Sequence, residues 1–117
     1  MTKTKKLKTS ANMRKVKKLL DEIPEEKKPI GLELYNELLF MQNTLNDLKE
    51  QVLTEGAVDM FKQGKQEFLR EHPALKAYMT LLQRYSQIYK QFIELLPVSE
   101  VQAATDELLE FINGAKP

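Results

Sequence analysis

Eight positively charged side chains lie within the first twenty residues of the chain, and no acidic residue lies among them. They are Lys3, Lys5, Lys6, Lys8, Arg14, Lys15, Lys17 and Lys18. Since the whole chain sums to +1, the remaining residues carry a net charge of −7. Clustered lysine and arginine bind phosphate groups through charge alone. These eight residues are the candidate contacts to a polyanion, and a solvated leader without a ligand is the alternative.

The residue inventory limits other kinds of chemistry. The chain has no cysteine and a single histidine, His72, which excludes thiolate zinc sites, cysteine nucleophiles and histidine-pair metal sites. Its four glycines are scattered, so no glycine-rich loop can hold a nucleotide. We therefore expect a non-enzymatic protein without catalytic residues, metal, cofactor or small-molecule substrate. His72 precedes Pro73 and is predicted to be a turn residue.

The composition is typical of one globular domain, with 42% hydrophobic and 30% charged residues. No stretch approaches the roughly 18 apolar residues of a membrane span, and the absence of cysteine gives no sign of an oxidising compartment. We expect no membrane partner and a cytoplasmic location, which is the host cytoplasm if the protein is viral.

The chain divides into three parts: residues 1–29, 30–97 and 98–117. In the first, Ser10 is a candidate N-cap for a short helix whose apolar residues recur every three or four positions. A linker over 24–31, with two prolines and a glycine, follows it. In the last, Ser99 and Gln102 are a candidate capping box for an acidic helix.

Two long helices are predicted in the middle part. Residues 31–54 carry a sustained apolar stripe, and residues 73–96 carry a heptad seam that contains Tyr78, Tyr85 and Tyr89. Between them, the apolar residues around Gly64 predict a short β-hairpin over 57–70, with a helical or irregular loop as the alternative. The expected fold is mainly α: a long antiparallel helical hairpin with this β-hairpin between its helices, a short basic N-terminal helix and a C-terminal helix.

The two long helices carry more apolar surface than their mutual contact hides, which indicates a homo-oligomer. Base stacking by the tyrosines and a monomer covered by its own terminal helices are the alternatives. The residues expected to form the oligomer contact are Leu38, Phe40, Met41, Leu45, Tyr78, Leu82, Tyr85, Tyr89 and Phe92.

Residues 15–97 resemble the small terminase subunits of tailed bacteriophages, in particular a compact branch of that family. The matching features are the helix end Glu55-Gly56, the variable segment around Gly64 and the helix start Pro73-Ala74-Leu75. The resemblance implies a non-catalytic, ring-forming protein that binds double-stranded viral DNA, here through the eight basic residues, and hands it to a large subunit with ATPase and nuclease activities. That large subunit is expected to bind the acidic last helix through Glu107, Leu108, Glu110 and Phe111. The sequence departs from the family after Leu96, where an acidic helix replaces an arginine-bearing segment.

Two other functions remain open. One is a helical adaptor or regulator that binds a protein partner, and the other is a dimeric, DNA-binding transcription regulator. The native mass separates them from the terminase interpretation, because only the latter requires a closed ring.

Overall fold

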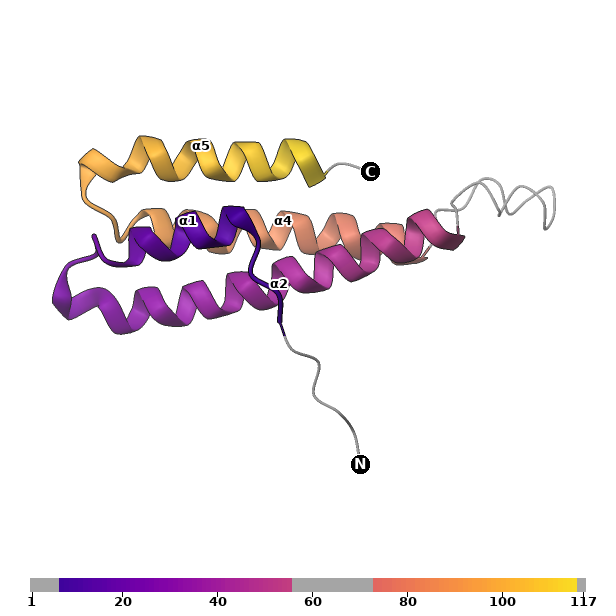
Figure 1. Cartoon of the computed structure of the whole chain (residues 1–117), viewed down its shortest axis with the longest axis horizontal. Coiled ribbons are helices and arrows are strands. Elements are labelled where there is room, and N and C mark those ends of the chain that lie inside the picture. Colours follow the sequence, from indigo (N-terminus) through magenta and orange to yellow (C-terminus); the bar gives the residue numbers. More distant parts are fainter. Residues whose placement is uncertain (1–6, 56–72, 116–117) are drawn as a thin grey trace, which may run out of the picture.

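The structure is a computed structural model of the chain, and it describes residues 7–55 and 73–115 (Figure 1). The described helices are α1 (Ala11–Leu20), α2 (Lys28–Glu55), α4 (Pro73–Ile93) and α5 (Val98–Ala115). A single 3₁₀ turn, η1 (Glu25–Lys27), leads directly into α2.

Successive described helices run in opposite directions and form a bundle (Figure 1). The most extensive contact joins α2 to α4, while α1 packs on α2 and α5, and α5 packs on α1 and α4. Each of these helices therefore has two antiparallel neighbours, which is the up-down-up-down arrangement of a four-helix bundle. α2 and α4 extend beyond the ends of α1 and α5 (Figure 1). That end of the hairpin is covered by neither terminal helix.

The spacing of apolar residues explains which face each long helix buries. The seam predicted on residues 73–96 is the buried face of α4, since its side chains recur every three or four positions. From α4 the core receives Ala74, Tyr78, Leu82, Tyr85, Tyr89 and Phe92. From α2 it receives Tyr35, Leu38, Met41, Gln42, Leu45 and Val52.

α1 and α5 complete the same core. α1 contributes Met13, Val16 and Leu19, and α5 contributes Ala104 and Leu108. The basic N-terminal helix is thus a structural member of the bundle. Its apolar face could not be removed from the hairpin without exposing side chains that are now inaccessible to solvent.

The predicted fold class is wrong in one respect. Every element that the structure describes is helical, and no strand occurs within residues 7–55 and 73–115. The segment 57–70, for which the sequence predicts a β-hairpin, lies outside the described residues. Its apolar residues fall in adjacent pairs, Met60-Phe61 and Phe68-Leu69, which a strand would place on opposite faces. The fold, as described, is mainly α without a β element.

Two helix starts also differ from the prediction. α2 begins at Lys28, because Pro29 falls in the first turn, where a helix needs no backbone N–H donor. Gly31 lies inside α2, where an added Cβ would stand 2.5 Å from Ile23 Cδ1 and 3.3 Å from Leu20 Cδ2. Gly31 therefore permits the close approach of these side chains. α5 begins at Val98, which places Ser99 inside the helix and rules out its predicted role as N-cap.

Candidate nucleic-acid interface

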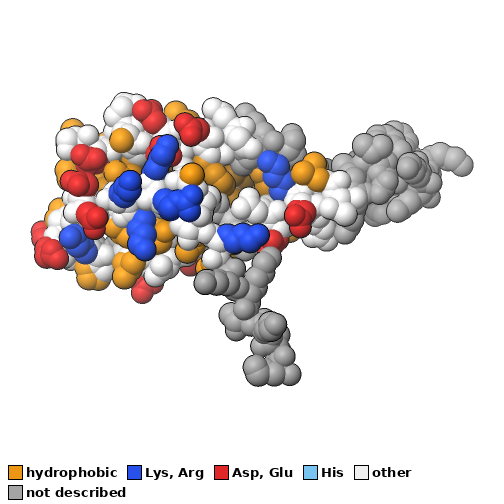
Figure 2. Space-filling model, viewed as in Figure 1, with side chains coloured by type: hydrophobic (Ala, Val, Ile, Leu, Met, Phe, Trp, Pro, Cys, Tyr) orange, Lys and Arg blue, Asp and Glu red, His pale blue; other side chains and the backbone are white. Residues whose placement is uncertain are grey.

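α1 has one apolar face and one basic face. Ser10 caps the helix, because its Oγ accepts a hydrogen bond from the Met13 backbone N–H at 3.1 Å. Met13 and Val16 are inaccessible to solvent on the inner face. The outer face exposes four of the predicted DNA contacts: Arg14, Lys15, Lys17 and Lys18. Figure 2 shows basic side chains gathered over α1.

The segment before α1 is fixed to α2. The Lys8 backbone N–H donates to Asn43 Oδ1, and Asn43 Nδ2 donates back to the Lys8 carbonyl oxygen, both at 2.8 Å. Arg14 Nη1 donates to the Thr9 carbonyl oxygen at 3.0 Å. Lys8 is therefore held near α1, whereas the predicted contacts Lys3, Lys5 and Lys6 lie outside the described residues.

A network of buried and half-buried polar groups holds α1 in place. Gln42 of α2 accepts a hydrogen bond from Ser10 Oγ at 2.6 Å. Its Nε2 donates to Asn12 Oδ1 at 3.1 Å and to the Tyr85 hydroxyl at 3.2 Å. Asn12 Nδ2 in turn donates to the backbone carbonyl oxygen of Glu107 and to its Oε1, both at 3.1 Å. These bonds join α1, α2, α4 and α5, so they fix the register and rotation of α1.

The cations of α1 are not equivalent. Lys15 Nζ lies 3.3 Å from Glu107 Oε2, and the Glu107 side chain is only 17% exposed. Within the part of the chain that the structure describes, no acidic group lies within ion-pair distance of Arg14, Lys17 or Lys18. On α1, the charge available to a ligand therefore belongs to these three residues, because Lys15 is partly neutralised by Glu107 of α5.

Two tyrosines of the core differ in how their hydroxyl groups are satisfied. Burial raises the pKa of Tyr85 far above its usual value, and the hydrogen bond from Gln42 opposes the shift only in part. Burial, and then the charges of Tyr85 and Glu107, raise the pKa of Tyr89 as well. Among the described residues, no group forms a hydrogen bond with the Tyr89 hydroxyl. Both side chains are neutral in the folded protein.

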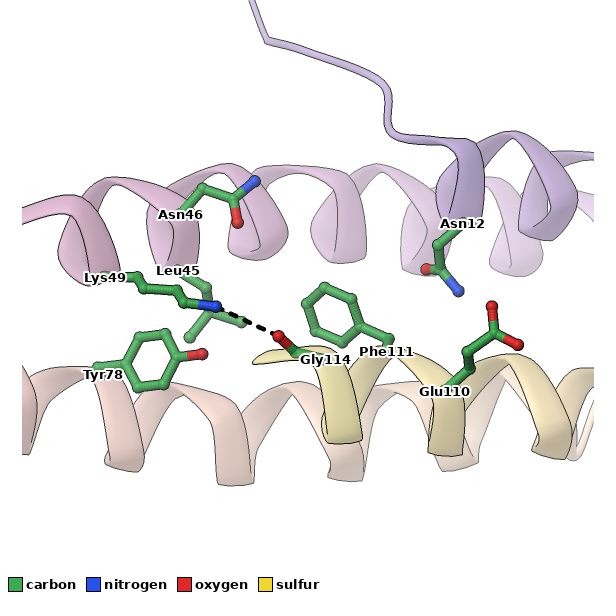
Figure 3. Close-up of a pocket in the computed structure, with 8 residues that line it drawn as sticks. All are labelled: Asn12, Leu45, Asn46, Lys49, Tyr78, Glu110, Phe111 and Gly114. Atoms are coloured by element: carbon green, nitrogen blue, oxygen red, sulfur yellow. Dashed lines mark hydrogen bonds between the residues drawn. The ribbon is translucent and has the colours of Figure 1, made fainter. Parts of the chain in front are cut away.

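A hollow opens beside the polar network (Figure 3). Residues from α1, α2, α4 and α5 line it: Asn12, Leu45, Asn46, Lys49, Tyr78, Glu110, Phe111 and Gly114. Lys49 Nζ donates to the Gly114 carbonyl oxygen at 3.2 Å, which places a cation at the C-terminal end of α5. Lys49 thus serves the bundle itself, and we assign no ligand to the hollow.

Most residues predicted to form the oligomer contact are buried inside a single chain. Leu38, Met41, Leu45, Tyr78, Leu82, Tyr85, Tyr89 and Phe92 all belong to its core. Phe40 differs from them, because its side chain is 55% exposed. Among the predicted partner-binding residues, Leu108 is buried, Glu107 pairs with α1, and the Phe111 ring lies 4.8 Å from that of Tyr85. Glu110 alone of these four is exposed.

The sequence reasoning missed Asn12, Gln42 and Asn43. Gln42 did carry a signal, because it lies four residues after Leu38 and three before Leu45, in phase with the apolar stripe of α2. A polar residue at such a position requires hydrogen-bond partners. Asn12 and Asn43 carried no comparable signal, because asparagine is common on exposed helix surfaces.

The described residues hold no group of three His, Cys, Asp or Glu side chains that could bind a metal ion, and His72 lies outside them. None of the described helices is long and apolar enough to cross a membrane. Comparisons with protein-family models, with curated proteins and with solved structures find no match to this chain.

Proposed function

We propose that this chain is the small subunit of a phage DNA-packaging terminase: a non-catalytic protein that binds double-stranded viral DNA, associates with further copies of itself and presents the DNA to a large subunit. The observation that carries the DNA-binding part is the outer face of α1. There Arg14, Lys17 and Lys18 stand free of ion pairs within the described residues, on a helix whose inner face is locked into the bundle.

Locking the helix favours binding. α1 spans ten residues, which at roughly 1.5 Å per residue corresponds to about 15 Å of phosphate backbone. Because the polar network fixes α1 before DNA arrives, no helix has to be ordered on binding. Contacts of this kind position a protein on the duplex without specifying a base sequence.

The acidic residues of α5 restrict the approach of DNA. Glu107 and Glu110 belong to α5 and lie beside α1, where their carboxylates repel DNA phosphate. On the α2 side, Lys8 is fixed through Asn43. The duplex therefore lies across α1 toward α2, with Lys8, Arg14, Lys17 and Lys18 as its contacts. On α5, the exposed Asp106, Leu109 and Glu110 remain available to a large subunit.

A second candidate is a helical adaptor or DNA-binding regulator that works without a ring. It is favoured by the burial of the α4 seam within one chain, because those side chains then need no second copy. The native mass separates the two candidates, since a species of many subunits supports the terminase and a monomer or dimer supports the adaptor or regulator.

The DNA-binding part is tested by removing two charges from α1. We expect Lys17→Gln/Lys18→Gln to weaken binding to a short random duplex by about tenfold or more at roughly 0.1 M salt. The matched control is Lys27→Gln/Lys90→Gln, which removes the same charge from exposed positions on η1 and α4. Equal affinities of the two variants would contradict the assignment.

A further inference from the structure

Glu107 of α5 is directed toward α1 through both of its carboxylate oxygens. Its Oε1 accepts a hydrogen bond from Asn12 Nδ2 at 3.1 Å, and its Oε2 lies 3.3 Å from Lys15 Nζ. Asn12 Nδ2 also donates to the backbone carbonyl oxygen of Glu107, at 3.1 Å. The carboxylate is therefore held in place by Asn12 as well as by Lys15.

Lys15 is held less firmly than its partner. The Lys15 side chain is 58% exposed, whereas the Glu107 side chain is 17% exposed. Within the described residues, Lys15 forms no second ion pair. The ammonium group of lysine is a point charge on a flexible stem. Lys15 can therefore exchange the carboxylate for another anion without any movement of α1.

Lys15 borders the basic face of α1. Lys18 follows it by three residues, so the two side chains lie about 60° apart around the helix and one turn apart along it. A phosphate near Lys18 is thus within the reach of Lys15. Carboxylate and phosphate oxygens both accept strong hydrogen bonds from an ammonium group. A DNA phosphate and the Glu107 carboxylate therefore compete for Lys15.

We propose that Glu107 is an autoinhibitory residue, whose carboxylate occupies Lys15 and so withholds a further phosphate contact from DNA. The inhibition is local, because it acts through one ion pair and leaves Arg14, Lys17 and Lys18 available. A phosphate that takes Lys15 leaves the Glu107 carboxylate beside it without a cation. The contact therefore weakens the binding that charge alone supplies.

Because Glu107 acts on the basic face of α1, this inference rests on the proposed function. The two can still be told apart. The proposed function requires that the wild type binds DNA through Lys17 and Lys18. The inference requires in addition that the contribution of Lys15 depends on Glu107.

The first test is a double-mutant cycle in the full chain, in which the affinity for a short random duplex is measured against salt concentration. Glu107→Gln keeps an oxygen that can accept the hydrogen bond from Asn12, and it removes the charge. We expect it to raise the affinity about three- to tenfold at roughly 0.1 M salt and to steepen the salt slope by about 0.9, since Lys15 becomes a phosphate contact. Lys15→Gln should weaken binding at most about twofold in the wild type and should reverse the whole gain in Glu107→Gln.

The matched control is Glu110→Gln. It removes the same charge from the next turn of α5, at an exposed position that forms no ion pair within the described residues. We expect the affinity to change by less than about twofold and the salt slope to stay the same, because no cation is released. An increase equal to that of Glu107→Gln would show a general effect of charge and would overturn the inference.

The second test uses the wild type, so it does not depend on the folding of a variant. Lysine side chains are acetylated with and without the duplex, and the modified positions are identified by mass spectrometry. DNA should lower the modification of Lys17 and Lys18 and leave that of Lys15 unchanged. In Glu107→Gln, DNA should protect Lys15 as well.

Two results would overturn this inference and leave the proposed function standing. One is equal protection of Lys15 and Lys18 in the wild type, and the other is an equal effect of Lys15→Gln with and without the Glu107 carboxylate. Absence of DNA binding in every variant, Glu107→Gln included, would overturn both.

Discussion

The side-chain amide of Gln42 donates a hydrogen bond to the Tyr85 hydroxyl, 3.2 Å away, and both side chains are excluded from solvent. This bond joins the two long helices at the point where α1 rests on them. The Tyr85 hydroxyl in turn donates a hydrogen bond to Met13 Sδ of α1, at 3.7 Å. The position of the basic helix thus depends on a polar residue in the core of the hairpin.

We expect Tyr85→Phe to lower the free energy of unfolding by about 1–3 kcal/mol, because it leaves one N–H of the buried Gln42 amide without an acceptor. Chemical denaturation followed by circular dichroism measures the change. A loss well below 1 kcal/mol would mean that the network contributes little to stability.

Tyr89→Phe is the matched comparison, since it removes a hydroxyl of similar burial that bonds to no described group. We expect the free energy of unfolding to stay within about 0.5 kcal/mol of the wild type or to rise, because a buried hydroxyl without a partner carries a desolvation penalty. A destabilisation equal to that of Tyr85→Phe would show that the Tyr89 hydroxyl has a partner.

The pH dependence of stability follows from the same two tyrosines. Burial raises the pKa of both above the ordinary value of 10.0, so above pH 10 the folded state binds more protons than the unfolded state. The stabilisation is complete below pH 10 and decreases above it, by about 1.4 kcal/mol per pH unit for each tyrosine. Denaturation midpoints from pH 8 to 11 measure this slope. Tyr89→Phe should make it shallower, and an unchanged slope would contradict burial of that hydroxyl.

Asn43 should control the order of the segment before α1. Asn43→Ala removes both hydrogen bonds to the Lys8 backbone. We expect hydrogen exchange at the Lys8 amide to accelerate at least about tenfold, since the amide loses its acceptor. Asn46→Ala, three residues further along α2, is the control and should leave that amide protected.

The sequence predicted helix positions well, because helix formation depends on local spacing. The repeat of Tyr78, Leu82, Tyr85 and Tyr89 correctly identified one buried face. It could not indicate which chain covers that face, since an apolar seam has the same spacing whether a helix of the same chain or of a second copy packs on it. For the same reason the sequence assigned residues 1–29 to a part of their own, although Met13 and Val16 are core residues of the bundle.

The close packing at Gly31 and the polar network around Gln42 could not be predicted, because they depend on contacts between residues of different segments. Gly31 marks a close approach to Ile23 rather than a helix break, which only the packing reveals. Gln42 was overlooked because its partners come from two other segments: Ser10 and Asn12 from α1 and its N-cap, and Tyr85 from α4. For the candidate site, the sequence supplied the cations, while the structure separated Lys15, which pairs with Glu107, from Lys17 and Lys18, which form no ion pair within residues 7–55 and 73–115.

The central claim is that the outer face of α1 binds DNA phosphate, and the salt dependence of binding tests it most directly. The logarithm of the association constant for a short duplex is measured against the logarithm of the salt concentration, for the full chain and for Arg14→Gln/Lys17→Gln/Lys18→Gln. Each lost phosphate contact should make the slope shallower by about 0.9, so the account predicts a change approaching three units per chain. An unchanged slope, or no binding by the wild type at low salt, would contradict it.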